Sequence, residues 1–97
     1  MKRLSNKEIL NELSLLNDWV LNDNQITKVY KLNSFMEVMS LANLVSDKSE
    51  QIDHHPKMII DFNQIEFLIT THSEGGITNL DFMLASFIEE TYNELFS

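Results

Sequence analysis

The chain has 97 residues, of which 43% are hydrophobic, and these values suit one compact domain with a modest core. Fifteen acidic residues against seven lysines and arginines give a formal net charge of −8, which repels phosphate backbones and argues against direct binding of nucleic acid. Without cysteine the chain forms no disulfide or thiolate metal site, and it lacks both a secretory signal pattern and the ~18 apolar residues of a membrane span. We therefore expect a cytoplasmic protein with no membrane association.

The N-terminal part predicts a helix over residues 6–16, followed by a hairpin. Ser5 can cap the helix, and Glu8 completes a capping box three residues later. Apolar residues then recur at helical spacing. A short strand over 19–21 and a longer one over 26–32 follow, joined by a polar turn. The longer strand alternates apolar and polar residues, which is typical of a sheet with one solvated face.

The middle of the chain predicts a long helix over residues 34–51 with Ser34 as its N-cap. The expected apolar stripe of this helix consists of Phe35, Val38, Met39, Ala42 and Val45. Two more strands are expected over 58–62 and 64–71, joined by a tight turn. In the second of these, alternate apolar residues share one face of the sheet.

A final helix is predicted after the loop SEGG, with Thr78 or Asn79 as its cap. The expected element order is therefore α-β-β-α-β-β-α. Hairpins separated by helices indicate an α+β fold in which a four-stranded antiparallel sheet carries its helices on one face. We expect residues 1–97 to form a single domain of this kind.

All three histidines of the chain occur in two short segments, EQIDHHP and TTH. Pro56 disfavours the α region for His55, so the long helix must end before His54 and leave both histidines in a loop. A hairpin then returns the chain to the neighbourhood of that loop, close to where His72 follows the fourth strand. The sequence therefore predicts that the three imidazoles converge at one end of the sheet.

Spacing alone leaves zinc binding, acid–base catalysis and simple backbone hydrogen bonding open for these histidines. Adjacent histidines rarely both reach one metal, and no i, i+4 histidine pair accompanies them, so we predict no metal. Acid–base catalysis is chemically easier because imidazole titrates near neutral pH. Glu50 lies where it can orient a histidine or simply be solvated. Asp81 falls in the first turn of the last helix, where the helix dipole alone would account for it.

Several separated segments agree with the pattern of one family. From about Trp19 to Tyr92 the chain resembles the pterin-4a-carbinolamine dehydratases, and the agreement in spacing along the chain makes the resemblance specific. The matching positions are Glu50, His54, His55 and Pro56 in E-x-x-x-H-H-P, the aromatic Phe62, Thr71-His72, Gly76-Ile77-Thr78, Asp81, and Leu84-Ala85.

The resemblance implies a hydro-lyase with the same sheet-and-helix fold. Family members dehydrate 4a-hydroxytetrahydropterin, left by aromatic amino-acid hydroxylases, to quinonoid dihydropterin, and they need no metal or organic cofactor. The site residues implied are His54, His55 and His72 as catalytic groups, Glu50 as a supporting carboxylate, and Trp19, Thr71 and Asp81 as substrate-binding residues.

The resemblance also implies partners. Members form homodimers that often pair into homotetramers, and an aromatic amino-acid hydroxylase is the expected pathway partner. Because the animal protein also serves as a dimerisation cofactor for a homeodomain transcription factor, an alternative is a pterin-binding or protein-interaction scaffold with little turnover. A further alternative is a dehydratase that acts on another pterin.

Overall fold

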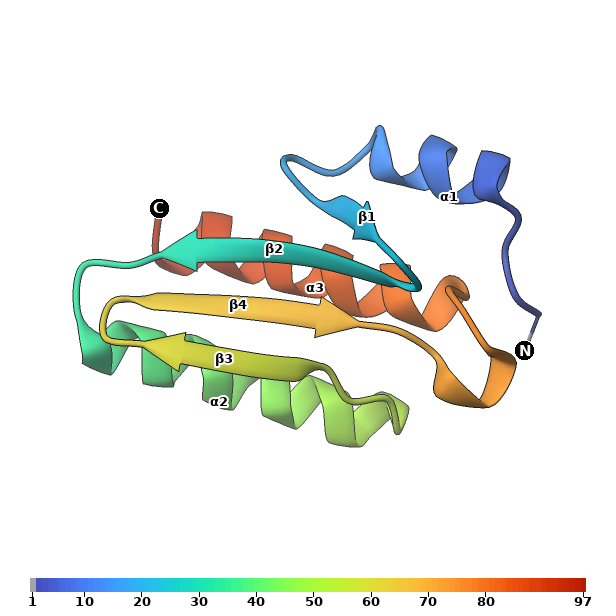
Figure 1. The fold of residues 1–97 in the computed structure, drawn as a ribbon. Helices are drawn as coiled ribbons and strands as arrows, with labels where there is room; N and C mark the ends of the chain where they lie inside the picture. The colour runs from blue at the N-terminus through green and yellow to red at the C-terminus, as the bar shows by residue number, and fades with distance from the viewer. Residues whose placement is uncertain (1) are drawn as a thin grey trace.

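The computed structural model describes residues 2–97 and has the expected order α-β-β-α-β-β-α, with one short 3-10 helix added (Figure 1). The strands lie in the order β1-β2-β4-β3, and every neighbouring pair is antiparallel. The predicted α+β class is therefore confirmed. The elements are α1 (Asn6–Leu13), β1 (Val20–Asn22), β2 (Gln25–Lys31), α2 (Phe35–Ile52), β3 (Lys57–Asp61), β4 (Gln64–Ile69), η1 (His72–Glu74) and α3 (Asn79–Leu95).

The core lies between the sheet and two helices. Figure 1 shows α2 and α3 side by side on one face of the sheet, with α1 beside the β1 edge. The predicted alternation in β4 is confirmed, because Ile65, Phe67 and Ile69 are fully buried. They meet Val38, Leu41 and Val45 of α2 and Leu84 and Ile88 of α3, which are also fully buried. Each such side chain contributes about 1.5–3 kcal/mol to folding. Within residues 2–97, no helix combines the length and apolar character that a membrane crossing requires.

The strands end within one or two residues of the predicted positions, and the larger differences lie in α1 and α2. α1 ends at Leu13 rather than near residue 16. The next backbone N–H groups, of Leu15 and Leu16, donate to carbonyls three residues back instead of four, and the chain then turns through Asp18 at φ 62°. In α2 the buried stripe begins at Val38, while Phe35 is 46% exposed. The first turn of α2 therefore extends beyond the core, and the expectation that Phe35 joins the stripe is wrong.

Four elements meet at one end of the sheet. α2 ends at Ile52, and Asp53 adopts the left-handed conformation at φ 51°, a region that aspartate tolerates. β3 then starts at Lys57, which pairs with Leu68 near the end of β4. The loop between α2 and β3 therefore lies beside the segment that leaves β4, and η1 and the start of α3 follow directly. This is the right-hand end of the sheet in Figure 1.

Candidate active site

His54 forms a buried pair with Asp81. The chain reverses at Asp53, and the His54 backbone N–H donates to the Ser49 carbonyl at 3.0 Å, which fixes the start of the loop against α2. The His54 side chain then faces inward, where Nε2 lies 2.6 Å from Oδ1 of Asp81. His54 is 9% exposed and Asp81 is fully buried. Of the two adjacent histidines, His54 is therefore the one that faces the protein interior.

Asp81 is held by the first turn of α3. Its Oδ2 accepts hydrogen bonds from the Thr78 backbone N–H and from the Thr71 hydroxyl, both at 2.8 Å. Because the Thr71 proton points to Asp81, the Thr78 hydroxyl donates to the Thr71 oxygen at 2.9 Å. Thr78 is the N-cap of α3, and Asp81 completes its capping box. The hydrogen bonds that cap α3 and those that hold His54 thus form one network, and the Asp81 carboxylate acts only as a hydrogen-bond acceptor in it.

His55 pairs with Glu50 at the surface. Its Nε2 lies 2.5 Å from Oε2 of Glu50, and the two side chains are 54% and 78% exposed. The prediction that Glu50 can orient a histidine is compatible with this contact, and the partner is His55 rather than His54. An exposed pair of this kind contributes little to stability because solvent screens it.

His72 begins η1 and lines a cleft. The cleft has a volume of about 320 Å³ and is lined by Asp23, Asn24, Gln25, Thr70, His72, Gly75 and Gly76. The Thr70 hydroxyl donates to the Asn24 carbonyl, so the turn between β1 and β2 is tied to the segment that carries His72. His72 directly follows Thr71, whose hydroxyl binds the carboxylate that also holds His54. The His72 backbone therefore adjoins the support of the buried histidine, while the His72 side chain is exposed.

Trp19 lies in a separate polar cluster. Its Nε1 donates to the Tyr30 hydroxyl at 3.1 Å, and Tyr30 donates to Glu89 at 2.5 Å. Lys28 pairs with the same carboxylate at 2.7 Å. Burial and the nearby carboxylate raise the pKa of Tyr30. For Glu89, burial is outweighed by the hydrogen bonds from Lys28 and Tyr30 and by the charge of Lys28, so its pKa is lowered. Because Tyr30 pairs with Ile65, at the far end of β4 from Ile69, this cluster is not brought together with the histidines.

The arrangement can position imidazoles for proton transfer. Nε2 of His54 and Nε2 of His55 each face a carboxylate, so a hydrogen on Nε2 is favoured and Nδ1 is left to accept or deliver a proton. Every fully buried side-chain nitrogen and oxygen in residues 2–97 has a hydrogen-bond partner, which holds the His54 network in one arrangement. Among the same residues, no group of three or more histidine and acidic side chains is arranged to hold a metal ion.

The sequence does not reveal that His54 pairs with Asp81, or that Thr78 donates a hydrogen bond to the same carboxylate. The available signal is the segment TNLD, in which a threonine three residues before an aspartate forms a capping box. That signal predicts a carboxylate bonded to the backbone at the start of α3 but does not predict its burial. It does not say which histidine will reach it, because the two residues are far apart along the chain.

The chain matches the family model described as pterin 4 alpha carbinolamine dehydratase over residues 2–91. A relative from Sulfurisphaera tokodaii, provisionally named pterin-4-alpha-carbinolamine dehydratase, is 39% identical over 93% of this chain and 97% of its own length. A relative from Chloroflexus aurantiacus with the same provisional name is 37% identical over the same shares.

Solved structures agree with these relatives. A crystal structure from Brucella melitensis, named transcriptional coactivator/pterin dehydratase, superposes with a TM-score of 0.89 at 28% identity, covering 92% of this chain and 97% of that one. Fold, sequence and the spacing of the histidine segments thus agree, and the chain belongs to the pterin-4a-carbinolamine dehydratase family.

Proposed function

We propose that the chain dehydrates 4a-hydroxytetrahydropterin to quinonoid dihydropterin by histidine acid–base catalysis. The observation that carries this proposal is the buried pair of His54 and Asp81 beside the loop of His72, in a chain that matches the dehydratase family over residues 2–91. Such a pair presents one ring nitrogen of a fixed histidine, which is what a proton-transfer reaction requires.

The reaction needs two proton transfers and no change of oxidation state. The bond between C4a and the hydroxyl oxygen breaks with its electron pair on oxygen, and a proton delivered to that oxygen releases water. The neighbouring ring nitrogen loses its proton, and its electron pair forms the new C=N bond. One group that donates and one that accepts therefore suffice, each contributing on the order of 10²- to 10⁴-fold.

The histidines divide these roles. His54 and His72 lie nearest the reacting centre in our proposal, and His55 serves as a second acid–base or positioning group with Glu50 as its orienting partner. Asp81 fixes the His54 ring through Nε2, which leaves Nδ1 for the substrate. Thr71 and Asp81 are buried, so they act on bound pterin through the histidines. Direct contact of Trp19 with substrate stays a prediction.

The biological setting is part of the same proposal. The enzyme is a cytoplasmic homodimer or homotetramer without a cofactor, and it recycles pterin oxidised by an aromatic amino-acid hydroxylase. The name of the Brucella structure supports a second candidate, because it gives that protein a coactivator role beside the dehydratase role. In that case the chain is an interaction scaffold with little turnover. A dehydratase acting on another pterin is a third candidate, which a panel of pterin substrates tests.

A coupled assay separates these candidates. Phenylalanine hydroxylase generates the 4a-carbinolamine from tetrahydropterin, and its decay is followed by absorbance with and without micromolar amounts of this protein. We expect faster decay with wild-type protein and a loss of most of the acceleration in His72→Ala. Asn43→Ala, an exposed change on α2, is the matched control. No acceleration by wild-type protein overturns the enzymatic proposal, and full activity of His72→Ala overturns the assigned role.

A further inference from the structure

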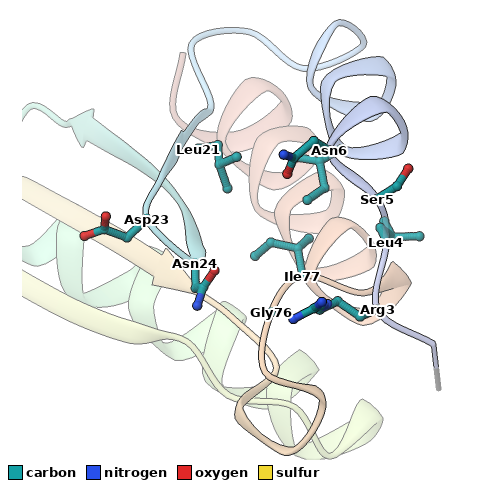
Figure 2. Close-up of a pocket in the computed structure, with 10 residues that line it drawn as sticks. Arg3, Leu4, Ser5, Asn6, Leu21, Asp23, Asn24, Gly76 and Ile77 are labelled. Carbon is teal, nitrogen blue, oxygen red and sulfur yellow. The ribbon is translucent and has the colours of Figure 1, made fainter.

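Residues 3–5, which we call the N-terminal strap, cross the loop that follows η1. The Leu4 backbone N–H donates to the Ile77 carbonyl at 2.8 Å, which ties the strap to the chain just before α3. The Arg3 guanidinium makes a long hydrogen bond of 3.4 Å to the Gly75 carbonyl. Figure 2 shows the Arg3 side chain lying along Gly76, with Leu4 and Ser5 next to it on the same segment. The strap thus contacts the loop from the outside.

The Arg3 side chain lies so close to Gly76 that an added methyl group would displace it. A Cβ added at Gly76 would lie 2.7 Å from Cδ and 3.2 Å from Cγ of Arg3, well inside normal contact distances. Gly76 lies outside the left-handed region, so its backbone conformation is open to alanine. Packing against Arg3 therefore determines how well alanine is tolerated at this position. The methylene stem of Arg3, more than its charge, therefore fills the space over this residue.

Gly76 connects the strap to the histidine segment. It forms an isolated antiparallel bridge with Thr71, in which the Thr71 N–H donates to the Gly76 carbonyl at 3.1 Å. The Gly75 N–H donates to the His72 carbonyl at 3.1 Å, and Gly75 closes η1 at φ 71°. A displacement of Gly75 and Gly76 would therefore move His72 and the Thr71 hydroxyl that binds Asp81.

Gly76 also stands between two clefts. The cleft of about 350 Å³ beside the strap and the cleft of about 320 Å³ beside His72 share Asp23, Asn24 and Gly76. Arg3 lines the first cleft and does not line the second. Arg3 therefore contacts the loop from the cleft beside the strap, which favours a role as a support and not as a group that touches substrate.

We propose that Arg3 is a positioning residue, which holds the loop from Thr71 to Gly76 so that His72 is correctly placed for proton transfer. This inference rests on the proposed dehydratase function. Arg3 acts through Gly76 and Gly75, and its loss gives more freedom to the His72 loop and to the Thr71 hydroxyl that supports Asp81.

The test is a double-mutant cycle between the two sides of the contact. Arg3→Ala removes the side chain that covers Gly76, and Gly76→Ala expels it. We expect each to lower kcat on the order of tenfold with a smaller change in KM, since a misplacement of about 1 Å can cost on the order of 100-fold. The kcat of the double variant should be no lower than that of either single variant, because both substitutions remove the same contact. Arg3→Lys keeps the methylene stem and restores most of the activity. Lys2→Ala is the control, because it also removes one positive charge and one long side chain, at the neighbouring position.

Wild-type kcat in Arg3→Ala overturns the proposal, as does a double variant whose loss is the product of the two single losses. An equal loss in Lys2→Ala also overturns it, because that result points to net charge. Absence of dehydratase activity in wild-type protein would sink the proposed function instead. Hydrogen exchange of the Gly75 and Gly76 amides then decides the mechanical claim: faster exchange in Arg3→Ala supports it, and unchanged exchange overturns it.

Discussion

Asp81→Asn removes the charge behind His54 while keeping the size of the side chain. In the wild type the carboxylate accepts from His54, the Thr71 hydroxyl and the Thr78 N–H. The asparagine oxygen can still accept from Thr71 and Thr78, which leaves the amide NH₂ facing the ring. Two donors would then meet at His54 unless the ring changes tautomer. We expect the hydrogen to move from Nε2 to Nδ1, and Nδ1 then no longer accepts a proton.

Two magnitudes follow from this geometry. Replacing a hydrogen bond to a charged, fully buried acceptor by one between neutral groups lowers the free energy of unfolding by about 1 kcal/mol. Losing the correct tautomer removes the acid–base contribution of His54, so kcat falls on the order of 10²- to 10⁴-fold. Urea unfolding measures the first quantity, and the coupled hydroxylase assay measures the second. Nitrogen-15 NMR of the His54 ring reports the tautomer directly.

Asp47→Asn is the matched control, because it makes the same chemical change at an exposed position on α2. It should leave both the urea midpoint and kcat near their wild-type values. The reasoning about His54 would be refuted by an Asp81→Asn variant that keeps wild-type kcat, or by a ring that retains its Nε2 hydrogen while activity is lost.

Two further predictions concern stability away from the histidines. The pKa of Glu89 lies below its ordinary value of 4.5, so its contacts with Lys28 and Tyr30 stabilise the fold above that value and are lost as pH falls through the lower folded pKa. Urea midpoints taken from neutral pH to below 4.5 should therefore decline less steeply in Glu89→Gln, and an unchanged decline contradicts this account. Phe62 adopts the left-handed region at φ 48° while 68% exposed, so Phe62→Asn should raise the free energy of unfolding by on the order of 1 kcal/mol, and a loss of stability would count against it.

Features that depend on neighbouring residues are the ones that the sequence predicts well. Ser5 and Glu8 form the expected capping box, and Ser34 and Thr78 cap their helices, because each cap needs only residues two or three positions away. The alternation in β4 follows from strand geometry in the same way. Pro56 likewise marks the end of the preceding helix, which closes at Ile52.

Contacts between distant segments are harder to predict. The helix dipole accounts for a carboxylate at Asp81, but its partner His54 lies 27 positions earlier and reaches it only because Asp53 reverses the chain. The same reversal pairs Glu50 with His55, although the four-residue helical spacing points to His54 as the partner. Trp19 belongs to a buried tyrosine and glutamate cluster that local spacing does not reveal.

The strand order β1-β2-β4-β3 has a consequence for how activity appears during folding. The central pair β2 and β4 joins Ile26 to Ile69, with the whole of α2 and β3 in the intervening chain, so this pairing closes a long loop and carries a large entropic cost. The pair of His54 and Asp81 further requires α3, the last element of the chain, to dock. Hairpins and α2 can form from local contacts before that event. Recovery of turnover on refolding is therefore a kinetic marker for the docking of α3, and it should lag behind the recovery of helical signal.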